Sequence, residues 1–439
     1  MNKRKILVSI LAASGLVTPM AHATNGYLPT GYGMKAEGMG GASIALPQDA
    51  LAAANNPAGM VMVGDRTDFG LTWFRPNRST EITGNNCTGA GMPPGCVSLN
   101  GTYDGNGKSD FLIPSFGYNK MISPNTALGV SVYGNGGMNT QYNTNPLKPF
   151  GGSSPFGINL EQLFIAPTWS MKVNQSNAVG VALNLAYQRF SASGLEPFNS
   201  AGNTTAIGSV TNNGTETSTG YGLRLGWTGE VSPAVTLGAT YQTKTKMGKL
   251  SKYSGLFADQ GSFDIPSNYG VGIAVKATPA TTVAFDIERT DYAGIPAVNN
   301  PLVLPANLGA ANGAGFGWQN INAFKLGVSY TYSPTLTLRA GLNHCDQPIQ
   351  SSQTFFNTLA PGVVQDHLSL GATWILANKS ELSVAYVHAF KKTVNGSAAA
   401  GFPGSIPGVP GAAAPLGGFG GGNANISMYQ DSIGISYGW

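Results

Sequence analysis

The clearest pattern along the chain is a strict alternation of apolar residues with small or polar ones. Between residues 179 and 188, Val, Val, Leu, Leu and Tyr take every second position, with Gly, Ala, Asn, Ala and Gln between them. The same period of two returns at residues 221–227, 269–276 and 324–330. Because successive side chains of a β-strand point to opposite faces, each segment is predicted to be a strand with one apolar face.

The connections between such segments have two lengths. Short turns are predicted at six places: 122–125, 174–177, 231–234, 278–281, 333–335 and 376–380. Long polar or Gly-rich stretches occupy seven: 82–109, 134–160, 191–217, 247–266, 292–319, 346–364 and 392–424. Six turns and seven loops join fourteen strands, and this alternation of lengths is typical of bacterial outer-membrane barrels. We therefore predict an all-β fold, a 14-stranded antiparallel transmembrane β-barrel over residues 67–439 that ends on the aromatic Trp439.

Composition agrees with a wall that faces lipid. Charged residues make up 10% of the chain, whereas soluble domains carry roughly 25%. A soluble β-sandwich would show the same alternation but would need many charges on its outward face. After the N-terminal region no apolar stretch approaches about 18 residues, so membrane-spanning helices are excluded and a closed barrel remains.

The first 23 residues read as a secretory signal peptide. Lys3, Arg4 and Lys5 precede an apolar run over 6–17, and Ala21-His22-Ala23 offers a small-x-small cleavage site. The run is too short to span a membrane, so cleavage after Ala23 and export are expected. Without it, 21 basic residues (24 − 3) face 20 acidic ones, and no basic patch suggests nucleic acid.

Cysteine usage agrees with export. Cys87 and Cys96 lie ten residues apart, counted inclusively, in a Gly/Pro/Asn-rich segment, and Cys345 is distant in sequence. A Cys87–Cys96 disulfide would contribute roughly 2.7 kcal/mol by the chain-entropy estimate. The alternative, metal ligation, lacks a nearby His or a second Cys pair. We expect the disulfide, and no metal or cofactor.

Residues 24–66 do not follow a strand pattern. The segment is rich in Gly, Ala and Asn, and Gly38, Gly40 and Gly41 interrupt it. It is too long for a simple tail before the first strand. We predict a hatch, a small plug folded inside the barrel; the alternative is a disordered leader outside it.

Several motifs resemble the FadL/TodX family of outer-membrane transporters of fatty acids and aromatic hydrocarbons. The start of the mature chain resembles that family's hatch, with its Asn-Pro-Ala motif at Asn56, Pro57 and Ala58. Residues 253–259 with 263–267 resemble its fourth external loop, and 318–320 with 338–342 its late strands. The chain departs from the pattern in its closing Trp439 and in its Gly/Pro/Ala-rich loop 392–424.

The resemblance implies passive uptake of long-chain fatty acids or hydrocarbons across the outer membrane of a Gram-negative bacterium. An external groove would capture the ligand, the hatch would gate its passage, and release would be lateral, beside a kinked third strand. Expected partners are the hydrophobic ligand, outer-membrane lipid and lipopolysaccharide, and a monomer is expected.

Three sets of residues are candidates for these steps. Loop residues offer an apolar groove, although they could instead pack the loops over the barrel mouth: Phe190, Leu195, Phe198, Leu256, Phe257, Phe263 and Ile265. The third-strand run Tyr133, Gly134, Asn135, Gly136 and Gly137 suggests a kink, because glycines inside a strand mark bulges; the alternative is an ordinary loop from Gly134.

The third set consists of cations at lumen positions: Arg224, Lys276, Lys325 and Arg339. Arg or Lys in a low-dielectric interior would bind a ligand carboxylate. Alternatively these cations pair with acids of the wall or hatch: Asp286, Glu288, Glu37 and Asp49.

Other function classes fit less well. Gly434-Ile435-Ser436-Tyr437-Gly438 matches the Gly-x-Ser-x-Gly pattern, but that motif needs a strand-to-helix elbow, and here it lies in the last strand. We therefore expect no enzyme. A general diffusion porin for small polar solutes would need a wide, charged lumen, and a surface adhesin or phage receptor would use the long loops.

Overall fold

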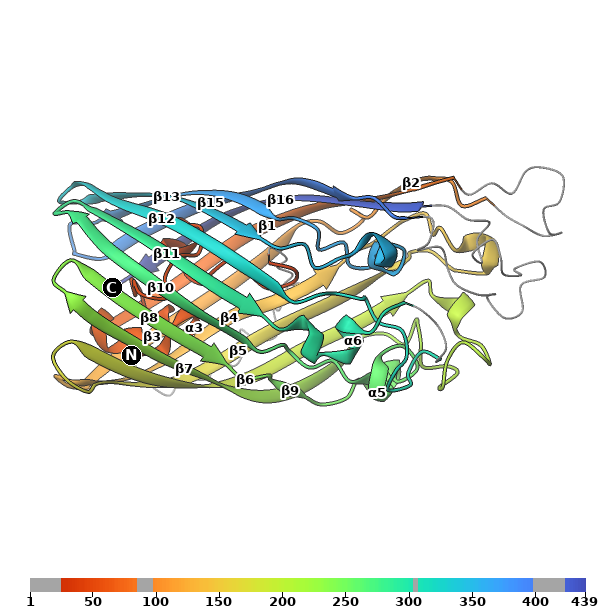
Figure 1. Ribbon diagram of the computed structural model, residues 1–439, viewed down its shortest axis with the longest axis horizontal. Coiled ribbons are helices and arrows are strands. Elements are labelled where there is room, and N and C mark those ends of the chain that lie inside the picture. The colour runs from red at the N-terminus through yellow and green to blue at the C-terminus, as the bar shows by residue number, and fades with distance from the viewer. Residues whose placement is uncertain (1–24, 85–97, 303–306, 398–422) are drawn as a thin grey trace.

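The computed structural model describes residues 25–84, 98–302, 307–397 and 423–439, and within them the chain forms one closed antiparallel barrel (Figure 1). Fourteen strands make its wall: β1 (Arg66–Thr83), β3 (Phe111–Ser123), β4 (Thr126–Asn139), β5 (Gly157–Lys172), β6 (Asn177–Ser193), β7 (Glu216–Ser232), β8 (Val235–Gln242), β10 (Asn268–Thr278), β11 (Thr281–Thr290), β12 (Ile321–Ser333), β13 (Leu336–Cys345), β14 (Asp366–Ile375), β15 (Glu381–Val394) and β16 (Asn423–Gly438).

Each wall strand pairs with its neighbour in the chain, and β16 closes the barrel on β1 in a register from Asp68 opposite Gly438 to Thr83 opposite Asn423. Two short strands extend the wall: β2 (Gly101–Asp104) pairs with β1, and β9 (Lys246–Met247) pairs with β7. The predicted fold class is confirmed, because the six short turns fall at one end of the molecule and the long loops at the other.

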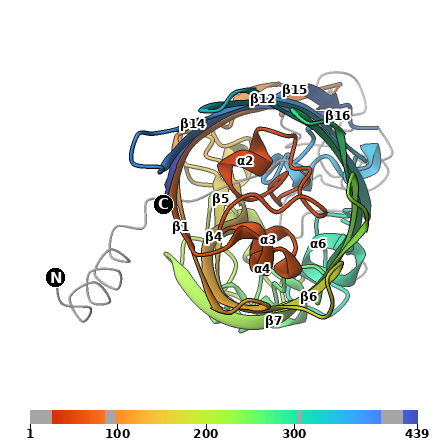
Figure 2. The same cartoon turned by 90° about the vertical axis from the view of Figure 1, so that its left-hand side faces the viewer.

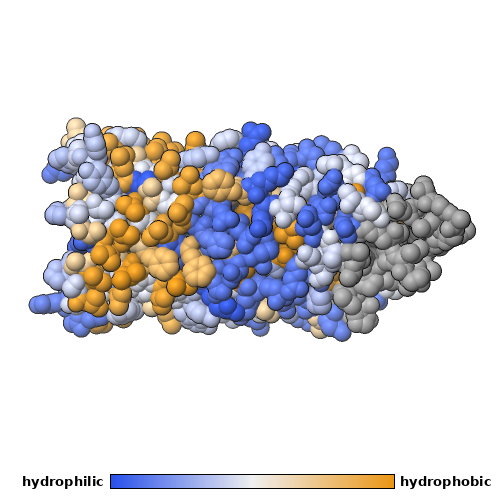
Figure 3. All heavy atoms as spheres, turned by 45° about the horizontal axis from the view of Figure 1, so that its top comes forward, coloured by the Kyte–Doolittle hydropathy of each residue, from blue (hydrophilic) through white to orange (hydrophobic). Residues whose placement is uncertain are grey.

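The alternation seen in the sequence sorts side chains between lipid and lumen. In β6, Leu183 and Leu185 are 41% and 42% exposed on the outer face, whereas Asn184 and Ala182 are buried on the inner one. Apolar side chains gather in a band near the short-turn end of the outer surface (Figure 3). Closure pairs the backbone groups of both edges, as a lipid-facing sheet requires. Among the described residues, no helix is long and apolar enough to cross a membrane.

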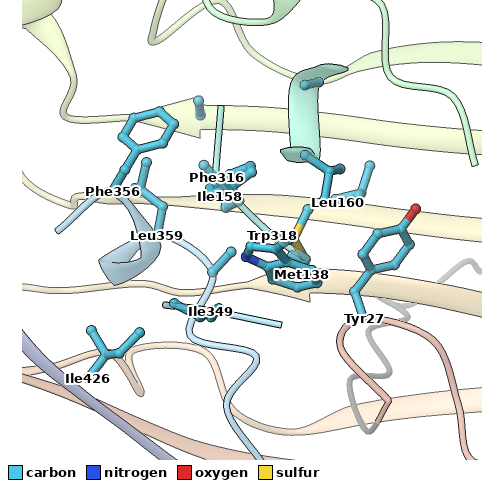
Figure 4. Packing of buried hydrophobic residues seen from close by; sticks show 14 of the residues in the cluster. Tyr27, Met138, Ile158, Leu160, Phe316, Trp318, Ile349, Phe356, Leu359 and Ile426 are labelled. Atoms are coloured by element: carbon cyan, nitrogen blue, oxygen red, sulfur yellow. The ribbon is translucent and has the colours of Figure 1, made fainter. Parts of the chain in front are cut away.

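At the other end, the long loops fold into short helices over the barrel mouth. These are η3 (Lys148–Phe150), η4 (Glu196–Phe198), η5 (Ser251–Tyr253), α5 (Ala258–Gly261), η6 (Tyr292–Gly294), α6 (Pro296–Asn299), η7 (Ser351–Gln353) and η8 (Phe356–Thr358). Their buried side chains form the largest apolar cluster of the molecule, here called the loop core, in which Trp318 lies among residues from several loops (Figure 4).

Residues 25–65, here called the plug segment, lie inside the ring of strands (Figure 2). They contain α2 (Met34–Glu37), α3 (Ala52–Asn55), η2 (Pro57–Gly59) and α4 (Met60–Val63). The barrel wall begins directly after them, at Arg66. The predicted signal peptide and the predicted Cys87–Cys96 disulfide lie outside the described residues.

Candidate functional site

The Asn-Pro-Ala motif lies where the plug segment contacts strands β6 and β7 of the wall. Asn56 donates two hydrogen bonds from Nδ2, to the carbonyl oxygens of Ile44 (2.8 Å) and Trp227 in β7 (2.9 Å). Its Oδ1 accepts from the Ala58 N–H at 3.1 Å and so caps η2. One amide therefore orders the plug internally and ties it to the wall.

Two glycines of the wall make this approach possible. A Cβ atom at Gly226 of β7 would overlap Oδ1 of Asn56, and one at Gly180 of β6 would overlap the backbone of Pro57. A side chain at either position would push η2 away from the wall. These two lumen glycines therefore leave the space in which η2 of the plug segment packs against the wall.

A second anchor joins α2 to the barrel at the short-turn end. Lys35 Nζ lies 2.6 Å from Glu381 of β15, and Arg66 of β1 binds both Glu381 and Asp68. Asp68 also accepts from the Ala50 N–H at 2.8 Å. Burial lowers the pKa of Lys35, Arg66 adds to the lowering, and Glu381 opposes it.

The predicted lumen cations are engaged by the protein itself. Arg224 donates to the Asn55 carbonyl of the plug segment and to Gln242; Arg339 donates to Gln48 of the plug segment and to Thr373. Lys325 pairs with Glu288 at 2.6 Å.

Lys276 differs from the other three, because it is exposed at the short-turn end rather than enclosed in the lumen. The strand still runs to Thr278, but Lys276 is close to its end. There all side chains are exposed, so the alternation between lumen and lipid no longer decides what a side chain faces. Of the three enclosed cations, Lys325 makes the alternative pairing with an acid, Glu288, whereas Arg224 and Arg339 bind carbonyl, amide and hydroxyl oxygens of the protein. Their part in binding a carboxylate stays a prediction.

The seven residues predicted to form an external groove are all buried. Each is at most 7% exposed; six belong to the loop core, and Ile265 belongs to a neighbouring cluster. Phe190 packs edge-on against Phe257, with ring centroids 4.7 Å apart, and Phe257 packs against Phe263 at 5.0 Å. The structure thus places these side chains beneath the loop surface, where they cover one another, rather than in an open groove.

Strand pairing in the wall is interrupted beside β4. The register between β3 and β4 ends at Phe116 opposite Val132. From Tyr133 to Asn139, β4 continues in register with β5, with a shift between Gly134 and Gly136 that leaves Asn135 as a bulge. The border between residues 111–115 of β3 and 133–139 of β4, here called the seam, is thus not held by paired strands in the described part of the chain.

The predicted kink residues lie at the seam, and the strand runs through them rather than ending in a loop at Gly134. The plug segment supports the displaced strand from inside. Gly137 donates its N–H to the Tyr27 carbonyl at 3.1 Å, and Tyr32 donates its hydroxyl to Asn135 Oδ1 at 3.1 Å. A Cβ at Gly136 would overlap the Tyr27 carbonyl oxygen, so glycine permits this close contact.

An apolar cluster lies at the seam: Phe74 of β1 with Phe111 and Ile113 of β3, and Leu163 of β5 packed against them. Leu163 stands opposite Gly134 and also lines an outer apolar cavity of about 900 Å³ with Ile165, Leu185, Tyr187 and Tyr221. One side chain therefore borders both the seam and the lipid-facing surface.

Sequence reasoning missed Leu163, the Phe74 cluster and Tyr27. The signal for the cluster was present, because Phe74, Phe111 and Ile113 are large apolar residues at lumen positions, where most other residues are small or polar. Tyr27 gave no such signal. Its ring lies 5.4 Å from that of Tyr292 and 6.0 Å from that of Trp318, contacts that form only when the N-terminal residues enter the loop core.

Comparison with known proteins agrees with this architecture. The model of one family, described as outer membrane protein transport protein (OMPP1/FadL/TodX), matches residues 16–401. No curated protein matches the chain.

Solved structures with the same fold include the P. putida toluene transporter TodX, with a TM-score of 0.67 and 16% identity over 93% of this chain and 98% of that one. A Pseudomonas aeruginosa FadL homologue has a TM-score of 0.68 and 17% identity over 94% and 99%. The Ralstonia pickettii toluene transporter TbuX has 0.58 and 17% over 93% and 98%.

Proposed function

Because this chain belongs to the FadL/TodX family of outer-membrane transport proteins, we propose that it carries long-chain fatty acids or hydrocarbons passively and releases them sideways through the seam. The family consists of outer-membrane channels of Gram-negative bacteria for hydrophobic compounds, not of enzymes. Related structures are named as toluene transporters, so small aromatic hydrocarbons are among the candidate ligands.

The observation that carries the proposal is the interrupted pairing between β3 and β4. Where neighbouring wall strands are paired, the backbone hydrogen bonds of the ladder would have to break before a ligand could pass. At the seam the barrier consists of side chains: Phe74, Phe111, Ile113 and Leu163. Exposed side chains change rotamers within nanoseconds, whereas local unfolding of a strand ladder takes microseconds or longer.

Tyr27 lies between the loop core and the seam. On one side lies the loop core, with Phe263, Tyr292 and Trp318 around the Tyr27 ring. On the other side the Tyr27 carbonyl holds Gly137 of β4. A ligand that enters among the loop residues and displaces Tyr27 would reach the bulged part of β4 at the seam. In this proposal the plug segment acts as the hatch, because Tyr27 and Tyr32 both contact the bulged part of β4.

A charged side chain introduced at the seam tests the proposed lateral release. Leu163→Lys should reduce uptake of a labelled long-chain fatty acid or hydrocarbon at least about tenfold, because passage would then require contact with an ammonium group. Val271→Lys is the control: Val271 is 58% exposed on the outer face of β10 and borders neither the seam cluster nor the outer cavity. Both variants place a lysine at an outward-facing position of the wall.

Equal surface amounts and normal heat-modifiable mobility in gels show that both variants have assembled. The proposal is supported if Leu163→Lys alone blocks uptake. If both variants transport at the parental rate, or if both are blocked equally while folded, release does not occur at the seam.

A further inference from the structure

Three lumen side chains on strands β13, β14 and β16 carry buried polar atoms without a hydrogen bond of normal geometry. Asn343 of β13, His367 of β14 and Gln430 of β16 are each 2% exposed. Both side-chain nitrogens of His367 and both polar atoms of each amide make no hydrogen bond of normal geometry among the described residues, although backbone groups of Asn343 and Gln365 lie near the His367 ring. Buried polar groups in proteins are normally hydrogen-bonded, so six unpaired atoms in one place need a physical explanation.

Register shows that the three form one row across the inner wall. Asn343 stands opposite His367, His367 opposite Ala389 of β15, and Ala389 opposite Gln430. Ala389 contributes no polar side-chain atom and little bulk. The name polar row is used below for Asn343, His367 and Gln430.

The polar row lies between the plug segment and the loop core. Two residues from His367 on the same face, Ser369 Oγ accepts from the Gly40 N–H of the plug at 2.7 Å. Two residues from Asn343 in the other direction, the Cys345 thiol contacts the Val364 carbonyl of a long loop at 3.6 Å. The row therefore lies at a level of the lumen between the loops and the plug segment.

The chemistry of the row is neutral. The nearest cation in register, Lys325 opposite Asn343, is bound to Glu288 at 2.6 Å. His367 makes no ion pair among the described residues, and an unpaired buried imidazolium would be costly, so the ring is taken as neutral. Two amides and a neutral imidazole offer donors and acceptors together, whereas a carboxylate can use donors alone.

We propose that the polar row binds the neutral polar group, above all the hydroxyl, of an otherwise hydrophobic ligand. This assignment rests on the proposed transport function and narrows it to oxygenated hydrophobes such as long-chain alcohols. A hydroxyl donates and accepts at once, and so matches a row in which each member can do either. A plain hydrocarbon leaves the row unpaired, and a carboxylate leaves its acceptors unmatched.

Three ligands of equal chain length test the proposal: dodecane, 1-dodecanol and dodecanoate, each radiolabelled and bound to the purified full-length barrel in detergent. The parental protein should bind 1-dodecanol most tightly. Near-isosteric apolar variants, Asn343→Leu and Gln430→Met, should each weaken 1-dodecanol binding about five- to tenfold, as expected for one lost hydrogen bond, and leave dodecane unchanged. His367→Leu should act in the same way.

The matched control is Gln188→Met. Gln188 is also a buried lumen amide, but it already donates to Ser218 Oγ at 2.8 Å, so its loss should not change the order of the three ligands. Folding is checked by heat-modifiable mobility. The row variants should keep or gain thermal stability, because they remove unpaired buried groups, whereas Gln188→Met should lose some.

The outcomes separate this inference from the proposed function. If none of the three ligands binds or is taken up, the transport function itself fails. If dodecane binds but 1-dodecanol binds no more tightly, or if the row variants weaken all ligands alike, the row does not recognise a hydroxyl. Unchanged selectivity in every variant would mean that the row holds water alone, and a parental preference for dodecanoate would assign it to carboxylates.

Discussion

At the residue scale, Asn56 shows how one side chain can hold a plug without a charge. It donates to Ile44 and Trp227, and it accepts from Ala58. Neither of the two carbonyl oxygens that it binds belongs to its own helix, so the amide joins three separate pieces of backbone. Its removal should loosen the plug segment and leave the strand ladders intact.

We expect Asn56→Ala and Asn56→Asp both to loosen the plug segment, and Asn56→Asp to loosen it more. Alanine leaves the two carbonyls without this donor, at roughly 1–3 kcal/mol for each group left unpaired. Aspartate keeps the cap on Ala58 but cannot donate, and it places a negative charge beside both carbonyl oxygens. Ion conductance in planar bilayers should rise in the order parental, Asn56→Ala, Asn56→Asp. Parental conductance in both folded variants would show that Asn56 does not hold the plug.

The sequence reveals some of these residues and hides others for a physical reason. Asn56 and Pro57 were found by motif because part of their role is local, a cap on Ala58 and a fixed backbone, whereas the bond from Asn56 to Trp227 has no local signal. Leu163 was not found, because its neighbours Phe74 and Ile113 belong to strands that it meets only after β4 departs from β3. The groove residues were recognised as apolar, but their burial depends on how the long loops fold over one another.

At the scale of elements, α2 is fixed to the wall by charge as well as by close packing, in which Met34 lies against Gly434 of β16. Lys35 and Arg66 share Glu381, which joins the plug segment, the first strand and β15 at the short-turn end. Removal of the shared carboxylate leaves two cations side by side in a partly buried place. Removal of Glu381 should therefore loosen the plug segment more than removal of an exposed ion pair does.

Glu381→Gln tests this anchor, with Asp65→Asn as the matched control. Asp65 pairs with Lys120 on the exposed surface at the same end, and exposed pairs contribute little to stability. Glu381→Gln should raise the frequency of plug opening about tenfold, seen as current steps in single-channel recordings. Asp65→Asn should leave the recordings unchanged. If the two variants give the same recordings, Glu381 does not anchor the plug segment.

The bulge in β4 marks the limit of prediction for elements. Glycines in the run Gly134 to Gly137 predicted that the strand would deform there, and they also allowed a loop from Gly134. The structure continues the strand to Asn139, because β5 offers a partner along its whole length and Tyr27 accepts the Gly137 N–H. Both partners come from distant parts of the sequence. A side chain at Gly136 would therefore displace Tyr27 before it could straighten the strand.

At the scale of the whole molecule, strand number and barrel closure followed from turn lengths and from the low share of charged residues. A chain with 10% charged residues cannot coat a soluble barrel of this size, so lipid is the solvent that its outer face suits. The interior could be predicted less well, because lumen positions serve both the plug and a ligand. The polar row and the wall residues that bind the plug segment have the same residue types. Only the hydrogen bonds seen in the structure distinguish the two sets.

Release into lipid rather than into water is the prediction that concerns the molecule as a whole. A ligand of about 16 methylenes carries roughly 13 kcal/mol of transfer free energy at ~0.8 kcal/mol per group. An axial route would expose this surface to water below the plug, whereas a ligand at the seam lies beside Leu163, whose side chain also borders the lipid-facing surface. In proteoliposomes, labelled ligand added outside should appear in the bilayer at a rate that albumin trapped inside does not change. Ion conductance should stay low throughout, because the plug need not leave the barrel. Uptake that depends on trapped albumin and survives Leu163→Lys would instead establish an axial channel.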